Sequence, residues 1–331
     1  MATSQCNIQT LACRSMKLTM ICLTISLLII STTYAQRAKP PVQMTLHPSK
    51  AAESARKYQL LPKAEELIDA DAAPLYEKAV ESLPAELNTD QINKWRKTPP
   101  DKLPQKQVQT TLQKFKPSLQ LLEQAAKCKR CDWTYEALQK LTQYRNIAFI
   151  LTLQIHSEIA QGRYDRAIDT LRTGYALAKN LSKEPMLIPG LVAVAITGVV
   201  SGQIEYLVQE PDAPNLYNAL IALPQPFIDL SDALEIEEPD TAQRVNHITN
   251  RLDRHIAALK CIEALRLYAG AHDGKFPDKL SDVTKIKIPD DPVTKKPFSY
   301  TRTGSEAVLE AQATENSEGR DAVRYEITFK E

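Results

Sequence analysis

The spacing of apolar residues changes once along this chain, near Pro289, and this change constrains the fold more than any other feature. Over residues 240–268 apolar positions recur every three or four residues, which predicts one long helix with a single buried face. Beyond the change they recur every second residue, which predicts three half-buried strands. The alternating positions are Phe298 and Tyr300, then Ala307, Leu309 and Ala311, then Val323, Tyr325, Ile327 and Phe329. We expect a small sheet packed on the end of the long helix.

The long helix is expected to join two parts of the protein. Its apolar stripe consists of Val245, Ile248, Leu252, Ile256, Leu259, Ile262 and Leu267. The first half of this stripe should pack on helices that precede it in the chain, and the last turns, with Leu265 and Tyr268, should pack on the sheet. We therefore expect Leu259 to be buried at a seam that both parts share.

The last quarter of the chain resembles the carboxy-terminal globular part of a type II secretion pseudopilin. The resemblance rests on ALRLYAGAHDGKFPDKLSDVTKIKIPDDPVTKKPFSYTRTG, from Ala264, and on VRYEITF near the end. It implies a helix end, a proline-studded loop and a small antiparallel sheet. No prepilin peptidase site followed by a long apolar helix is present, so an ordinary filament subunit is excluded. The loop 315–321 lies where the major pseudopilin binds calcium, but its spacing matches no calcium loop, and we expect a solvated hairpin loop.

The part of the chain between the amino-terminal region and the long helix is predicted to be helical. Prolines divide residues 51–104 into short helices. The clearest unit spans residues 133–180, where two apolar stripes flank Gly162, and AQGRYDRAIDTLRTGYALAKN resembles a tetratricopeptide-type hairpin. Only one such hairpin is found, and a solenoid needs at least three repeats. The expected fold class is therefore mainly α: an irregular helical stack, residues 50–238, followed by the long helix and a small antiparallel, pilin-like sheet, residues 239–331.

An apolar stretch from Met186 to Val208 has two interpretations. It carries no charge between Glu184 and Glu205, and Gly198 and Gly202 stand in a G-x-x-x-G spacing. A membrane helix would use these glycines for close packing, and so would a buried core helix. We favour the core helix, because Pro189 and Gly190 interrupt the stretch and leave less than a full span of about 20 residues.

The amino-terminal residues predict export. Arg14 and Lys17 precede an uncharged apolar run, residues 18–30, and a small-x-small exit ends at Ala35, which is typical of a secretory signal peptide. We expect cleavage after Ala35 and a secreted or periplasmic protein that meets the membrane only through this segment. An uncleaved anchor is the alternative, and translation could also begin at Met16. Residues 36–49 contain three prolines, and we predict a mobile lead-in.

Two cysteines form the only spacing with intrinsic reactivity, Cys128-Lys129-Arg130-Cys131. Haem attachment would require a histidine at the next position, which is Asp132, and a zinc site would require further ligands with matching spacing. A structural disulfide that pins a turn between two helices is the favoured prediction for an oxidising compartment. A redox pair of the thioredoxin kind is the alternative.

The remaining chemical candidates are few. His247 and His255 could share a face of the long helix, where a solvated polar face is expected, and His156 lies in an apolar stripe typical of a core histidine. No nucleophile elbow, phosphate loop or dinucleotide motif is found, so no catalytic residue, cofactor or metal ligand is predicted. With 41 basic and 40 acidic residues, the chain offers no overall charge that would attract nucleic acid.

Two phrases, APNLYNALIALPQPFIDL and ALRLYAGAHDGKFPDKLSDV, with Cys131-Asp132-Trp133 upstream, resemble a family of uncharacterised bacterial secreted proteins. The resemblance implies secretion and this architecture, and it implies no activity. We therefore expect a helical scaffold or binding module for protein or peptide partners. An enzyme is the alternative, either a thiol oxidoreductase that uses Cys128 and Cys131 or a hydrolase.

Overall fold

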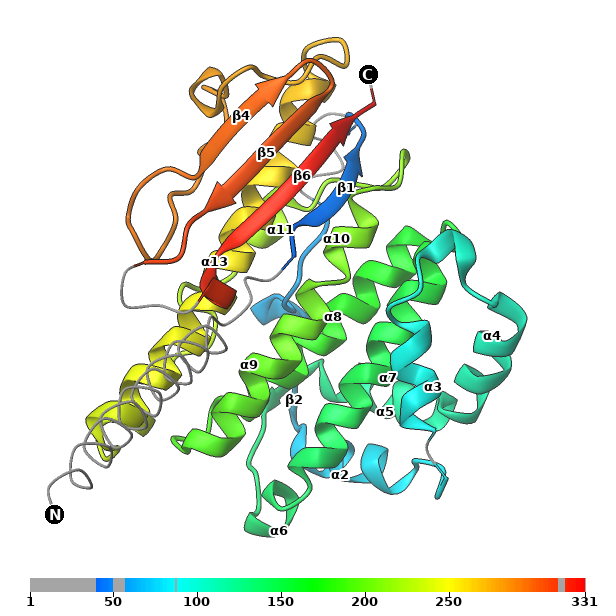
Figure 1. The fold of residues 1–331 in the computed structure, drawn as a ribbon. Coiled ribbons are helices and arrows are strands. Elements are labelled where there is room, and N and C mark those ends of the chain that lie inside the picture. The colour runs from blue at the N-terminus through cyan, green and yellow to red at the C-terminus, as the bar shows by residue number, and fades with distance from the viewer. Residues whose placement is uncertain (1–39, 50–56, 87, 315–318, 331) are drawn as a thin grey trace, which may run out of the picture.

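The structure is a computed structural model that describes residues 40–49, 57–86, 88–314 and 319–330. It confirms a mainly α fold with a small carboxy-terminal sheet (Figure 1). The predicted signal segment, residues 1–35, lies outside the described residues.

The helical body consists of short helices arranged around three long ones. The short helices are α2 (Ala73–Glu81), α3 (Thr89–Trp95), α4 (Gln105–Lys114), α5 (Lys116–Ala125), α6 (Tyr135–Leu138), α10 (Ile204–Leu207), α11 (Tyr217–Ile221) and α12 (Ser231–Leu234). The three long helices are α7 (Leu141–Ile159), α8 (Tyr164–Leu181) and α9 (Leu187–Ser201), and each packs against the other two.

The predicted helical hairpin is confirmed as α7 and α8. Gly162 turns the corner between them with a φ of 66°, a conformation that a glycine adopts without steric cost. The next helix, α9, packs against both helices of the hairpin, and the part of the chain that the structure describes contains no second hairpin of this kind. The body is therefore an irregular stack rather than a solenoid.

Helix α9 has an apolar outward face as well as an apolar core face. In the described part of the chain, residues 187–207 are the one stretch long and apolar enough to cross a membrane. Its inward residues, such as Ile196 and Val200, are fully buried against α7 and α8. Outward residues are half-buried or exposed, and Ile188 is 60% exposed. The packing of the inward face supports the core-helix interpretation.

The long helix is α13 (Pro239–Gly270), and it lies behind the sheet in Figure 1. The sheet contains β1 (Val42–Leu46), β4 (Ser299–Thr303), β5 (Glu306–Ala311) and β6 (Val323–Phe329), in the order β1-β6-β5-β4. Strands β4, β5 and β6 are the three that the period-two pattern predicts, and they pair antiparallel.

Strand β1 corrects two predictions. Residues 42–46, predicted to belong to a mobile lead-in, pair in parallel with β6, so the sheet is mixed rather than purely antiparallel. The reason is a short alternation within VQMTL: Met44 and Leu46 are buried on the α13 side, while Gln43 is exposed. Five residues suffice for an edge strand when a neighbour is already in place.

The body, the long helix and the sheet share one hydrophobic core. A single cluster of buried residues includes Leu151 of α7, Leu259 of α13 and Leu309 of β5. Helix α13 contacts α9 and α11 in the body and β6 in the sheet. Leu259 and Leu265 are fully buried, as the stripe predicts, whereas Tyr268 is half-buried and stacks on His272.

Candidate ligand-binding pocket

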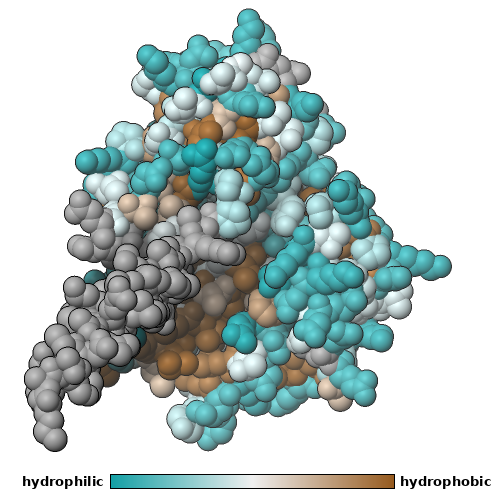
Figure 2. All heavy atoms as spheres, in the orientation of Figure 1, coloured by the Kyte–Doolittle hydropathy of each residue, from teal (hydrophilic) through white to brown (hydrophobic). Residues whose placement is uncertain are grey.

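A pocket of about 310 Å³ lies where the helical body, α13 and the sheet meet. Helix α9 and the residue that caps it contribute Val194, Gly198 and Gly202, α13 contributes Ile248, Arg251, Leu252 and His255, and the sheet contributes Val42, Val323, Arg324 and Tyr325. Pro40, Glu205 and Ala322 complete its lining. Figure 2 shows that apolar residues also cover the neighbouring outward face of α9. Mostly apolar walls with a few polar groups are the usual composition of a binding pocket.

Gly198 of α9 and Gly202, the residue that caps this helix, leave the pocket hollow on one side. A Cβ atom built on Gly198 would meet no described atom within 4 Å outside its own helical turn. At Gly202 such an atom would contact only the carbonyl oxygens of its own helix, at 3.4 and 3.6 Å. The G-x-x-x-G spacing therefore borders open space in this structure.

Three polar side chains from different elements converge in the pocket. Tyr325 of β6 donates its hydroxyl hydrogen to Glu205 Oε1 of α10 over 2.8 Å, and His255 Nε2 of α13 lies 3.0 Å from the same oxygen. Burial raises the pKa of the Tyr325 hydroxyl far above its ordinary value, so this group stays a donor. When the imidazole is neutral, Glu205 favours the tautomer with hydrogen on Nε2, and Nδ1 is then an acceptor.

One wall of the pocket is held by ion pairs around Asp321. Arg251 donates from Nε and Nη2 to Asp321 Oδ1, at 2.9 and 2.5 Å, and His247 Nδ1 lies 3.5 Å from Oδ2. Arg254 donates to the backbone carbonyl of Asp321 over 2.7 Å. Asp321 belongs to the predicted hairpin loop 315–321, of which residues 315–318 lie outside the described part. The described residues contain no group of three or more His, Cys, Asp or Glu side chains that could hold a metal ion.

The histidine predictions are partly right. His156 is fully buried and bonded, with Nδ1 3.1 Å from Gln203 Oε1 and Nε2 on the carbonyl of Thr98, as expected of a core histidine. His255 is wrongly predicted to lie on a solvated face. Its side chain is only 18% exposed, because α10 places Glu205 against it. Glu205 and Tyr325 were not predicted as site residues, since only the fold brings them to His255.

The cysteine pair does not form the predicted disulfide: Cys128 and Cys131 are free, buried thiols. Residues 128–130 form strand β3, which pairs in parallel with β2 (Ile68–Asp71), so the expected helix-to-helix turn is also wrong. Three residues of extended chain span about 10 Å, more than a disulfide allows between Cα atoms. Burial raises the pKa of both thiols, and the nearby Asp71 carboxylate adds to the effect at Cys128.

We expect both thiols to be unreactive in the folded protein. A thiol with a raised pKa holds little thiolate at neutral pH, and the thiolate is the reactive species. Brief iodoacetamide treatment followed by peptide mass spectrometry should find Cys128 and Cys131 unmodified, with full modification in guanidinium chloride. Rapid labelling of the native protein, or recovery of a Cys128–Cys131 disulfide, would contradict this expectation.

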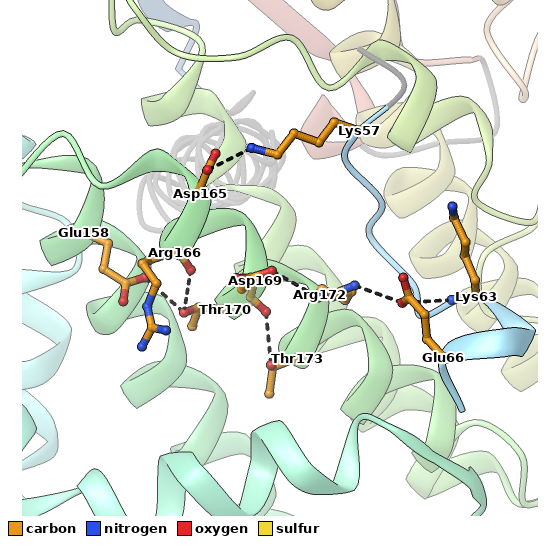
Figure 3. Close-up of polar contacts among 10 residues, drawn as sticks. All are labelled: Lys57, Lys63, Glu66, Glu158, Asp165, Arg166, Asp169, Thr170, Arg172 and Thr173. Carbon is orange, nitrogen blue, oxygen red and sulfur yellow. Dashed lines mark hydrogen bonds and ion pairs between the residues drawn. The ribbon is translucent and has the colours of Figure 1, made fainter. Parts of the chain in front are cut away.

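A second hollow, about 400 Å³ in volume, lies along the polar side of α8. It is lined in part by Glu66, Arg166, Asp169 and Arg172, and Figure 3 shows Arg172 between Glu66 and Asp169. Arg172 contacts Glu66 and Asp169, each over 3.1 Å. Lys57 pairs with Asp165 over 2.9 Å near the start of α8. These contacts fasten residues 57–66 to the helix, so this hollow is the weaker candidate.

Glu158 is a buried carboxylate between α7 and α8. It accepts a hydrogen bond from Thr170 Oγ1 over 3.0 Å (Figure 3). It accepts another from Gln154 Nε2 over 2.5 Å, and it is 2% exposed. Burial raises the pKa of Glu158 above its ordinary value, although both hydrogen bonds oppose the shift. The folded state therefore binds this proton more tightly than the unfolded state, and stability falls as the pH rises through the folded pKa.

Replacing Glu158 with glutamine is expected to stabilise the protein at pH 8 and to have little effect at pH 4. The amide keeps the shape of the side chain: its oxygen still accepts from Gln154, and its NH2 group can donate to Thr170 Oγ1, whose hydrogen then bonds to the carbonyl of Arg166. It also removes the cost of a buried charge, so we expect a melting temperature about 2 °C higher at pH 8. Melting curves between pH 4 and pH 8 measure this. The exposed Glu136 provides the control, because Glu136→Gln should change neither value. Equal gains at both pH values would refute the explanation.

Comparison with known proteins finds no similarity that bears on the pocket: no protein-family model, no curated protein and no solved structure matches the chain.

Proposed function

We propose that the protein is a secreted or periplasmic binding module that holds a protein or peptide partner in the pocket between α9, α13 and the sheet. The observation that carries the proposal is the convergence of Glu205, His255 and Tyr325 in a hollow with mostly apolar walls. Apolar walls supply affinity by removing surface from water, and a few fixed polar groups supply orientation. The resemblance of the last quarter of the sequence to a pseudopilin and the predicted signal peptide support a role outside the cytoplasm.

The enzyme alternatives have less support. The raised pKa values and burial of Cys128 and Cys131 disfavour a thiol oxidoreductase. A hydrolase of the serine or cysteine kind needs a nucleophile beside its histidine. The described lining of the pocket has no serine, threonine or cysteine next to His255. Binding is therefore the function that the geometry supports best.

Filling the pocket tests the proposal. Gly198→Leu adds a side chain where a Cβ meets open space, so the fold should tolerate it while the pocket loses volume. Ala195→Leu adds the same side chain at an exposed position of α9 that does not line the pocket. Each variant is cross-linked in the native envelope fraction, and the captured proteins are compared by quantitative mass spectrometry. We expect partners that the wild type and Ala195→Leu recover and that Gly198→Leu loses. Recovery of the same proteins by all three would refute the pocket as the binding site.

The location is tested separately. Intact-mass measurement of the protein from the envelope fraction should give an amino terminus at or near Gln36. A mass that retains residues 18–30 would indicate a membrane anchor instead.

A further inference from the structure

The outer edge of β1 carries main-chain groups available for pairing. Leu46 offers its carbonyl to Lys330 N over 3.0 Å, on the β6 side, which fixes the alternation of the strand. Val42, Met44 and Leu46 therefore turn their main-chain groups toward β6, and Gln43 and Thr45 turn theirs outward. Among the described residues, the amide and carbonyl of Gln43 have no partner on that side.

Part of this edge is already covered by the helical body. The amide of Thr45 donates to Gln209 Oε1 over 3.2 Å, so the residues that follow α10 stand against the end of β1. An added strand would lie about 4.8 Å from β1 and cannot extend past this contact. The accessible edge is thus the beginning of β1, around Gln43.

The accessible end of the edge adjoins the pocket. Pro40 and Val42 line the pocket, and Val42 lies on the same face of the sheet as the buried Met44 and Leu46. Side chains alternate between the two faces of a strand, so an added strand would direct every second side chain toward α13. The first such side chain would meet the hollow next to Gly198 and Gly202.

We infer that the partner is an extended segment of a protein, which pairs with Gln43 as an additional strand and places one apolar side chain in the pocket. Main-chain pairing supplies orientation, and the pocket selects the side chain, as in other cases of strand addition. The mostly apolar lining and the volume of the pocket favour a valine-, leucine- or methionine-sized group. This inference rests on the proposed function and specifies how the same site is used.

The probe is a phage-displayed library of random octapeptides, selected on the purified protein. The selected peptides are synthesised, and their dissociation constants are measured by fluorescence anisotropy. We expect sequences with one strongly preferred apolar residue. Methylating the peptide amides one at a time should weaken binding about tenfold at alternate positions near that residue, because every second amide faces β1.

Two pairs of variants examine the protein side of the interface. Gln43→Pro removes the outward amide, at an edge position where proline is tolerated, and Gln43→Ala is its control because it keeps that amide. Proline should weaken binding about tenfold and alanine less than about twofold. Gly198→Leu should weaken binding at least as much as Gln43→Pro, and Ala195→Leu should not.

The outcomes separate this inference from the proposed function. Loss of binding in Gly198→Leu, with no alternation in the methylated series and no effect of Gln43→Pro, would overturn strand addition and leave the pocket as the binding site. Selection of helical peptides with apolar residues three and four apart would likewise overturn it in favour of docking on the outward face of α9. If no selected peptide binds Gly198→Leu more weakly than the wild type, both strand addition and the pocket as the binding site are overturned. The methylated peptides are tested on the wild-type protein, so they still show whether the peptide pairs as a strand if Gln43→Pro folds poorly.

Discussion

Leu259→Asp is expected to unfold the helical body and the sheet together. Leu259 is fully buried in the cluster that both parts share, and aspartate there would place an unpaired carboxylate among apolar side chains. The cost is about 4 kcal/mol or more, a large fraction of the stability of an ordinary domain. Hydrogen exchange followed by mass spectrometry measures peptides of α7, α8 and β4–β6 separately, and protection should fall in all of them.

The control for this variant is Gln243→Asp, at an exposed position near the start of the same helix. It adds the same charge to α13 without burying it, so exchange should stay close to that of the wild type. Retained protection in β4–β6, with loss in the body alone, would show that the sheet and the end of α13 fold independently. The shared core would then not couple the two parts.

Arg254→Met should destabilise the protein nearly as strongly, for an electrostatic reason. Arg254 and Asp291 form a fully buried pair, with Nε and Nη2 donating to the two carboxylate oxygens over 2.9 and 2.8 Å. Methionine fills a similar space but leaves the carboxylate without its cation, which costs about 3–5 kcal/mol. Urea denaturation at pH 7 measures the change in the free energy of unfolding.

The double variant Arg254→Met/Asp291→Asn distinguishes the loss of the contacts of Arg254 from the cost of a buried Asp291 carboxylate without a partner charge. Asparagine keeps Oδ1 to accept from the amide of Val293, and its NH2 group, in place of Oδ2, can donate to the hydroxyl oxygen of Thr294. If the buried carboxylate that lacks its cation is the main cause of the lost stability, the double variant should recover more than half of that stability. A double variant as unstable as Arg254→Met would assign the loss to the contact with the carbonyl of Asp321 and to packing.

The fold follows from local patterns wherever those patterns are long. The 32 residues of α13, the α7–α8 hairpin and the strands β4–β6 lie where their periodicity predicts them. Strands β2 and β3 have only 4 and 3 residues, too few for a period to stand out, and the 5 residues of β1 lie between prolines that obscure their alternation. The prediction of a disulfide is wrong for the same reason, because the pairing of β3 with β2 holds Cys128 in an extended segment.

The candidate site could not be predicted from the sequence, because its parts are distant along the chain. Glu205 and Tyr325 are 120 positions apart, and Glu205 and His255 are 50 apart. None of the three belongs to a motif with a fixed spacing, and only tertiary packing brings them together. The glycines at 198 and 202 did stand out, but their spacing alone fits close helix packing as well as the open hollow that they border.

Strand β1 also has a consequence for the order of folding. Gln43 and Glu326 face each other across 283 positions, so the sheet cannot close until almost the whole chain is available. Bringing together ends so far apart costs about 5 kcal/mol of chain entropy, and the prior folding of the intervening helices reduces that cost. A chain that emerges amino terminus first must keep Met44 and Leu46 uncovered until the last strand arrives. During that interval the apolar side of β1 is open to chaperones and to unwanted association.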